Sequence, residues 1–296
     1  MQIVLTGSSG RVGRAIYQAL AAKHQVIGID RSPFSTTKIV ADFVETELLV
    51  RAMRGADAVI HTAALHAPHV GTVPDIEFHR VNVEGTRLVL EAARTAGLHR
   101  LVFTSTTALF GQTIDRGVAA WVTDETIPKP RSIYHQTKLA AESLLQEAAD
   151  ESLAIRVIRM SRSFPDQADV MTMHRLSRGV DIRDVADAHV AALTNDGPFY
   201  QSYIISGKTP FLPEDCSLLA INLKEVIRKR APELLIAFQK RGWELPSSID
   251  RVYDSSSARL GLGWTPQYGF EEVLSQLDRR SLEVLPVHIR HNHLEE

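Results

Sequence analysis

Short apolar runs alternate with amphipathic helical patterns over the first two-thirds of this chain. The runs are rich in β-branched residues and predict strands at residues 2–6, 25–30, 37–41, 58–61, 101–104 and 154–160. Helical periodicity predicts helices between them, near residues 11–23, 47–53, 76–95 and 132–149. Because the strands are continuous apolar runs, helices should cover both faces of the sheet, as in a parallel sheet. We therefore expect an α/β fold with a doubly wound parallel sheet.

The alternation stops after residue 160. Residues 161–177 are polar and interrupted by proline, whereas a helix near 183–193 and a strand near 202–205 resume the core. From Thr209 onward, prolines separate short helical pieces, which predict a small C-terminal lobe. The expected division is a core of residues 1–160 completed by about 178–206, a lobe of residues 161–177 and 207–285, and a frayed tail at 286–296.

Composition and charge narrow the expected partners. Apolar residues make up 44% of the 296 residues and charged residues 23%, ordinary values for a globular protein. Since the net charge is −2 and no block of like charges occurs, we expect neither nucleic acid nor a membrane as partner. No apolar run reaches bilayer-spanning length, and the first residues lack a secretory signal pattern. A single cysteine, Cys216, fits a reducing compartment, so we expect a cytoplasmic protein.

A glycine-rich segment, residues 6–13, joins the first predicted strand to the first predicted helix. Gly7 permits a tight turn, Gly10 lets the backbone approach a pyrophosphate, and Gly13 allows close packing of helix on strand. The free amides at the start of that helix then face negative charge. This pattern predicts a dinucleotide cradle in a Rossmann sheet; the alternative is an ordinary glycine-bearing turn. The residues between the glycines that complete the expected cofactor site are Ser9, Arg11 and Val12.

Asp30 ends the second predicted strand, where a carboxylate can accept hydrogen bonds from both ribose hydroxyls of the adenosine. It would also repel a 2′-phosphate, which favours NAD over NADP. Arg31 beside it weakens this preference because an arginine there can pair with the phosphate. The alternative interpretation is that Asp30 only forms the turn after the strand.

The next two strand ends extend the same predicted site. Asp42 and Phe43 supply an acceptor and a ring that could hold adenine, although a turn aspartate and a core phenylalanine fit almost as well. His61 is expected to be packed or hydrogen-bonded rather than a proton carrier. The small residues after it suit a backbone running against the cofactor: Thr62, Ala63 and Ala64.

Tyr134 and Lys138 stand four residues apart on a predicted helix, so they share one face. The lysine ammonium should lower the pKa of the tyrosine, which can then exchange a proton with a substrate hydroxyl. Lys138 can also hydrogen-bond the nicotinamide ribose. A third partner is expected among the hydroxyls that end the fifth strand, at residues 104–107, although such hydroxyls commonly only cap a loop.

Taken together, these motifs resemble the extended short-chain dehydrogenase/reductases, in the epimerase/dehydratase-like branch. The resemblance covers about residues 1–280 and includes the glycine loop, the strand-five segment ending in Gly111, and the tyrosine-lysine pair. It also includes three further segments, at residues 81–86 (VNVEGT), 181–188 (DIRDVADA) and 262–266 (LGWTP). The resemblance implies that Thr106 is the catalytic hydroxyl, that Ser105 touches the nicotinamide, and that Asn82 belongs to the cofactor-binding set.

Two departures from the family pattern bear on the substrate. Dehydratases carry Asp-Glu where this chain has Thr107 and Ala108, so dehydration is not expected. Residues 159–165 lack the asparagine that holds a nucleotide diphosphate, and only a short span separates them from Asp184. That layout is closest to the uronate dehydrogenases, which bind a free sugar acid. The candidate substrate-binding residues are His66, Thr106, Thr107, Ser161, Arg162, Ser163 and Arg175.

Arg162 or Arg175 could pair with a carboxylate, although a surface or structural role for each arginine is equally open. A metal site is not expected, because His66 and His69 have no carboxylate set beside them. The leading hypothesis is an NAD-dependent dehydrogenase acting on a secondary hydroxyl or hemiacetal of a sugar or sugar acid. Its rivals are an epimerase that retains NAD and a non-catalytic dinucleotide sensor. The resemblance also implies a homodimer paired through the helices near 76–95 and 132–149.

Overall fold

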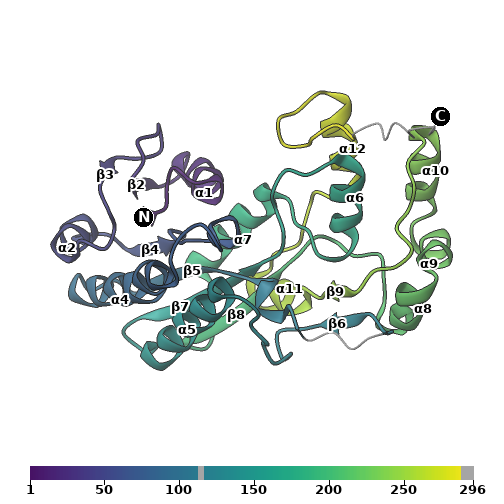
Figure 1. Cartoon of the computed structure of the whole chain (residues 1–296). Coiled ribbons are helices and arrows are strands. Elements are labelled where there is room, and N and C mark those ends of the chain that lie inside the picture. The colour runs from purple at the N-terminus through teal and green to yellow at the C-terminus, as the bar shows by residue number, and fades with distance from the viewer. Residues whose placement is uncertain (113–116, 288–296) are drawn as a thin grey trace.

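Seven parallel strands form the central sheet of the computed structural model, which describes residues 1–112 and 117–287. Their order is β3-β2-β1-β4-β5-β7-β8, so the chain builds outward from β1 in one direction and then in the other from β4 (Figure 1). This confirms the doubly wound parallel sheet, whose ligand-binding edge lies where the strand order reverses. The strands are β1 (Gln2–Thr6), β2 (Gln25–Asp30), β3 (Ile39–Val40), β4 (Ala58–His61), β5 (Arg100–Thr106), β7 (Ala154–Met160) and β8 (Tyr200–Ile205).

Helices cover both faces of the sheet because alternate strand residues are apolar on each side. Along β1, Ile3 and Leu5 belong to one buried cluster and Val4 to another. The first cluster packs under α1 (Arg11–Ala21) and α7 (Ile182–Thr194). The helices over the second are α2 (Thr46–Met53), α4 (Gly85–Thr95) and α5 (Ile133–Ala148).

The segment predicted as one helix near 76–95 consists of three pieces. A short α3 (Asp75–Phe78) leads into a π-helical stretch, η2 (His79–Glu84), and α4 follows directly, so the helical path is continuous but its hydrogen-bond pattern changes. Three alanines on the helices expected to form the dimer, Ala92, Ala93 and Ala141, are completely buried within one chain. Packing inside the chain therefore accounts for these small residues.

No helix was predicted in residues 161–177, but the second half of this segment forms α6 (Ala168–Ser177). Polar side chains on this helix are buried, so the sequence has no clear apolar stripe. Thr172, for example, is fully buried, and its hydroxyl is satisfied inside the protein because it donates to the Ala168 carbonyl at 2.5 Å.

The helix of residues 256–262 packs against β8 and α7, and the other remaining elements stand beside the sheet, at the right of Figure 1. A separate buried cluster that includes Phe211, Leu219 and Phe238 holds them together. A two-stranded parallel sheet, β6 (Ala120–Val122) with β9 (Arg251–Tyr253), was not predicted. Among the described residues, no helix has the length and hydropathy needed to cross a membrane. The other helices are α8 (Cys216–Ile221), α9 (Leu223–Arg230), α10 (Pro232–Arg241), α11 (Ser256–Leu262) and α12 (Phe270–Asp278).

Candidate active site

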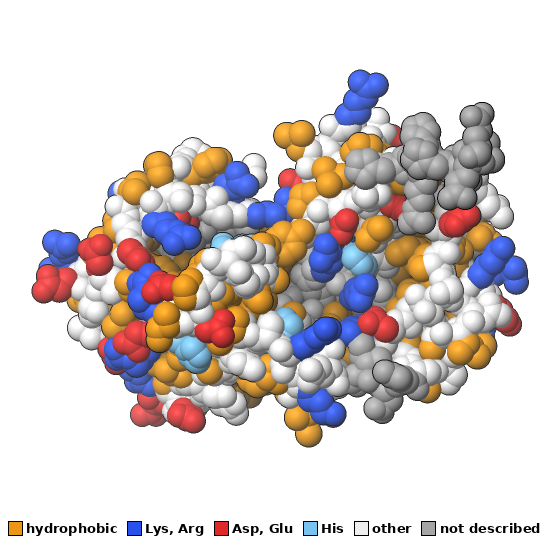
Figure 2. Space-filling model, viewed as in Figure 1, with side chains coloured by type: hydrophobic (Ala, Val, Ile, Leu, Met, Phe, Trp, Pro, Cys, Tyr) orange, Lys and Arg blue, Asp and Glu red, His pale blue; other side chains and the backbone are white. Residues whose placement is uncertain are grey.

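A cavity of about 650 Å³ opens at the carboxyl ends of β1, β4, β5 and β7. Figure 2 shows the hollow between the two halves of this face, with Lys, Arg and His side chains gathered around it. The predicted cofactor, catalytic and substrate residues line this cavity, except Asn82 and Arg175. The fold therefore gathers most of the predicted residues in one cavity, and their roles remain predictions.

The glycine loop forms the floor of the cavity. Gly7 has a φ of +74°, and a Cβ there would lie 2.5 Å from Thr62 Oγ1. A Cβ on Gly13 would lie 2.1 Å from the Gly7 carbonyl oxygen, because α1 packs directly on the turn. Gly10 is the N-cap residue of α1, and no described side chain caps this helix. The first backbone amides of α1 are therefore free to bind an anion. The loop thus fits a dinucleotide diphosphate.

Asp30 is fixed at the end of β2 by two backbone amides. Ser9 N donates to Oδ2 at 3.0 Å and Ser32 N donates to Oδ1 at 2.9 Å. Arg31 is exposed and lines the cavity beside it. The carboxylate therefore faces the place where an adenosine ribose would lie next to the glycine loop.

Asp42 and Phe43 both line the cavity and are also tied into the protein. Asp42 accepts from the Val44 amide at 3.3 Å, and the Phe43 ring lies 5.2 Å from the ring of His61. His61 is hydrogen-bonded to the hydroxyl of Thr6 at 2.6 Å, and burial lowers its pKa to about 3. His61 therefore stays neutral, and its structural role is confirmed.

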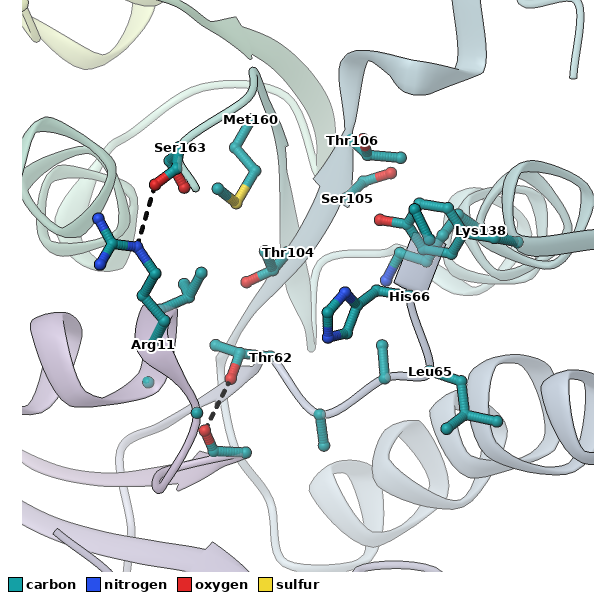
Figure 3. Close-up of a pocket in the computed structure, with 18 of the residues that line it drawn as sticks. Arg11, Thr62, Leu65, His66, Thr104, Ser105, Thr106, Lys138, Met160 and Ser163 are labelled. Carbon is teal, nitrogen blue, oxygen red and sulfur yellow. Dashed lines mark hydrogen bonds between the residues drawn. The ribbon is translucent and has the colours of Figure 1, made fainter. Parts of the chain in front are cut away.

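Tyr134 and Lys138 project from α5 into the cavity, as Figure 3 shows for Lys138. The side chain of Thr106 hydrogen-bonds the Tyr134 phenol. Burial nevertheless raises the pKa of Tyr134 to about 12, and burial lowers the pKa of Lys138 to about 7 although Glu142 opposes the shift. The expected lowering of the Tyr134 pKa is therefore not seen, because desolvation outweighs the hydrogen bond with Thr106.

Three buried polar atoms in the cavity wall have no hydrogen-bond partner among the described residues: Ser105 Oγ, Ser161 Oγ and His66 Nδ1. A buried polar atom without a partner is costly in a folded protein, so such atoms mark a place for a ligand or for water. Thr106 differs from them, since its hydroxyl also accepts from the Ala108 amide at 3.1 Å. Thr106 therefore caps the next turn and contacts Tyr134 at the same time.

Arg175 was wrongly placed in the substrate site. It is buried, its guanidinium donates to Asp181 Oδ2 at 3.0 Å, and it does not line the cavity. Arg178, which the sequence analysis missed, does line it and donates to His174 Nε2 at 3.3 Å. Arg162 also lines it, half-exposed and paired with Asp166 at 2.7 Å.

Asn82 lies behind the cavity wall, not in it. Its amide donates to the Leu65 carbonyl at 2.9 Å and to Thr137 Oγ1 at 3.1 Å, and its oxygen accepts from the Leu65 amide at 2.8 Å. Asn82 is buried, so it joins the loop after β4 to the helix that carries Tyr134. The expected contact of Asn82 with the cofactor is replaced by this positioning role.

Three rings in the cavity wall pack against one another. The His66 ring stacks on Phe164 with centroids 5.7 Å apart and meets His69 edge-on at 4.6 Å. Within residues 1–112 and 117–287, no group of three His, Cys, Asp or Glu side chains is arranged to hold a metal. His66 lines the cavity, and its contact with a substrate remains a prediction.

The glycine loop at the reversal point of a doubly wound sheet, with Tyr134 and Lys138 in the same cavity, defines a dinucleotide-binding protein of the Rossmann type. Residues 3–166 match the NAD dependent epimerase/dehydratase family, and the chain belongs to that family. This membership confirms the resemblance to extended short-chain dehydrogenase/reductases and identifies NAD as the cofactor.

Relatives of known activity match about half of the chain. A ketoreductase of a farnesylated dihydroquinoline oxide from Stigmatella aurantiaca is 34% identical over 171 residues, 54% of this chain and 49% of that protein. L-arabinose 1-dehydrogenase (NAD(P)(+)) from Haloferax volcanii is 34% identical over 162 residues, 50% of this chain and 61% of that protein. The chain spans about half the length of the curated relatives that it matches first.

Solved structures share the whole fold. MoeE5, in complex with UDP-glucuronic acid and NAD, is 22% identical with a TM-score of 0.70, over 95% of this chain and 100% of that chain. A mutated uronate dehydrogenase is 18% identical with a TM-score of 0.66, over 97% and 89%. At these identities, the likeness shows the fold alone.

Proposed function

We propose that the chain is an NAD-dependent dehydrogenase that oxidises a secondary hydroxyl or hemiacetal of a compact, anionic, sugar-like substrate. NADH would leave after each turnover. The observation that carries the proposal is that Tyr134, with Thr106 bonded to it, and Lys138 share one cavity with the glycine loop. The 34% identical L-arabinose 1-dehydrogenase supports a free sugar as the class of substrate.

The residues that would hold NAD follow from the cavity. The uncapped amides of α1 and the Arg11 guanidinium would hold the diphosphate, and Asp30 would accept the ribose hydroxyls. Lys138 would reach the nicotinamide ribose. NAD, when bound, supplies the acceptor for the hydride. The fixed carboxylate of Asp30 favours NAD over NADP, since it repels a 2′-phosphate.

Tyr134 would take the proton of the substrate hydroxyl while Thr106 donates a hydrogen bond to the substrate oxygen. Because burial raises the pKa of Tyr134 to about 12, little phenolate exists near neutral pH. The ammonium of Lys138 would favour the phenolate, but burial lowers the pKa of Lys138 to about 7. This charge is therefore present mainly below that pH, and the rise of phenolate with pH comes from Tyr134 itself. Oxidation should therefore become faster as the pH rises.

Arg162 and Arg178 line the cavity and offer positive charge there. Each is paired with a carboxylate, Asp166 at 2.7 Å and Asp250 at 3.4 Å, and both arginines are partly exposed. A substrate carboxylate could replace these counter-ions and accept two parallel hydrogen bonds from a guanidinium. This arrangement supports an anionic sugar.

The test is steady-state kinetics of Arg178→Gln with a free sugar acid and with the matching neutral sugar. The KM for the acid should rise at least about tenfold while the KM for the neutral sugar changes less than about twofold. Arg241→Gln, which breaks a pair with Asp278 outside the cavity, is the matched control. A UDP-sugar turned over with a higher kcat/KM than every free sugar acid would overturn the proposal.

The second candidate is an epimerase that keeps its NAD, since structures of UDP-sugar 4-epimerases share this fold, for example at a TM-score of 0.68 over 94% of the chain. Such an enzyme would release no NADH. A non-catalytic sensor would have no use for Tyr134 and Lys138, which are both present in the cavity. NADH release therefore separates these functions.

We also propose a cytoplasmic homodimer paired through α4 and α5. The buried alanines of these helices give it no support, so the proposal rests on the family resemblance. Light scattering at micromolar protein tests it, and a monomer mass would refute it.

A further inference from the structure

Arg11 lies where the cofactor cradle meets two later segments of the chain. It begins α1 directly after the glycine loop and lines the cavity. Its Nε donates to the Ser163 carbonyl at 3.0 Å, and Figure 3 shows the two residues side by side on the side of the pocket opposite Lys138. Its guanidinium also pairs with Glu283, near the end of the described chain. A cation of the cradle is therefore held by a carboxylate that does not belong to the sheet.

Glu283 is held in place by the residues on either side of it. Leu285 N donates to the Asp166 carbonyl at 2.9 Å, and Ala168 N donates to the Leu285 carbonyl at 3.0 Å. Val284 is buried in a cluster with Ala168 and neighbours from α6 and α12. Because backbone hydrogen bonds and an apolar anchor fix this segment, the carboxylate is presented to Arg11 by the fold itself.

The negative charge of Glu283 beside Arg11 should lower the affinity for the cofactor. The diphosphate of a dinucleotide is anionic, and the α1 amides and Arg11 are the groups that face it. A carboxylate that occupies Arg11 competes with the diphosphate for the same guanidinium and also repels it. Arg11 and Glu283 are 20% and 38% exposed, so solvent screens the pair only in part.

We propose that Glu283 weakens dinucleotide binding by competing with the diphosphate for Arg11, and so keeps the cofactor exchangeable. This inference rests on the proposed function, because a dehydrogenase must release NADH in every cycle. An enzyme that retains NAD would gain nothing from such a competitor. Glu283 acts through Arg11 and is a positioning residue in this account.

The test is the affinity of Glu283→Gln for three probes in the absence of any sugar: NAD, ADP-ribose and adenosine. NAD and ADP-ribose, which carry the diphosphate, should bind about fivefold more tightly, the range of a partly exposed ion pair. Adenosine, which lacks it, should bind as it does to the unaltered protein. Displacement of bound NADH should be slower by a similar factor.

Two controls isolate the Arg11 pair. Asp278→Asn breaks the pair with Arg241, which lies outside the cavity, and should leave all three affinities unchanged. In an Arg11→Gln background, the further change Glu283→Gln should have no effect, because the competition has been removed. Glu283→Ala should tighten NAD as Glu283→Gln does, and the unfolding temperature of each variant without ligand shows whether it is folded.

Unchanged or weaker NAD binding in a folded Glu283→Gln or Glu283→Ala variant would overturn the proposal. An equal change for adenosine would also overturn it, because the effect would then be a general change of the cavity. A failure of the sugar-acid proposal would appear only in the kinetics with sugars and would leave these binding constants as they are. The two proposals can therefore fail separately.

Discussion

Lys138 gives the most quantitative prediction, because its ammonium is buried inside the protein. The side chain is 3% exposed, and its Nζ lies 3.7 Å from the centroid of the Phe103 ring. Burial lowers its pKa from 10.5 to about 7, with Glu142 opposing the shift. The unfolded chain therefore binds this proton at a higher pH than the folded chain does.

The sign and size of the effect on stability follow from this difference. A lowered folded pKa means that the free energy of unfolding is greatest above about 10.5, falls as the pH falls, and levels off below about 7. One pKa unit corresponds to about 1.4 kcal/mol. Between pH 9 and pH 6, the buried ammonium should therefore reduce the free energy of unfolding by about 2–3 kcal/mol.

Urea unfolding of the unaltered protein and of Lys138→Met at pH 9 and pH 6 measures this contribution. Methionine keeps most of the apolar stem and does not titrate, so the variant should lose about 2–3 kcal/mol less than the unaltered protein on acidification. Lys224→Met, at an exposed position of α9, is the control and should follow the unaltered protein. Parallel pH dependence in Lys138→Met and the unaltered protein would show that the pKa of Lys138 is not lowered.

Three further substitutions test the site. Tyr134→Phe should reduce turnover at least about a hundredfold and leave NAD affinity within about twofold, because only the proton path is removed. Asp30→Ala should weaken NAD binding and reduce the discrimination against NADP, as titrations with both would show. Asn82→Ala should lower the free energy of unfolding by about 2–3 kcal/mol in urea, because it leaves the buried Leu65 backbone without its partners.

Each of these has a contrary outcome. More than about a tenth of the original turnover in Tyr134→Phe would remove Tyr134 as the acid/base group. An unchanged ratio of NAD to NADP affinity in Asp30→Ala would mean that this carboxylate does not face the ribose. Stability equal to that of the unaltered protein in Asn82→Ala would mean that the loop after β4 is held by other contacts.

Much of the fold could be predicted because it depends on local patterns. The apolar runs of β1, β2, β4 and β7 match the predicted bounds, since a buried parallel strand has few other sequences available to it. The glycine loop was equally predictable: contacts of 2.5 and 2.1 Å at Gly7 and Gly13 exclude any side chain. Chemistry that depends on short spacing along one element, such as Tyr134 and Lys138 on α5, was also accessible.

What the sequence did not reveal depends on tertiary contacts. Because α6 was not predicted, the sequence could not show which of Arg175 and Arg178 faces the cavity. Arg175 instead forms a buried ion pair with Asp181, six residues further along the chain. The π-helical stretch turns Asn82 toward the Leu65 backbone, which periodicity does not predict. The raised pKa of Tyr134 comes from burial by distant segments and could not be read from its spacing to Lys138.

The central claim is that this chain is a dehydrogenase that releases NADH. The measurement that tests it most directly is NADH absorbance with excess NAD and a panel of free sugar acids and neutral sugars, with Tyr134→Phe in parallel. The account predicts many equivalents of NADH per chain with at least one free sugar acid, and almost none with the variant. Conversion of a sugar to its epimer with no NADH accumulating, or equal NADH formation by Tyr134→Phe, would contradict it.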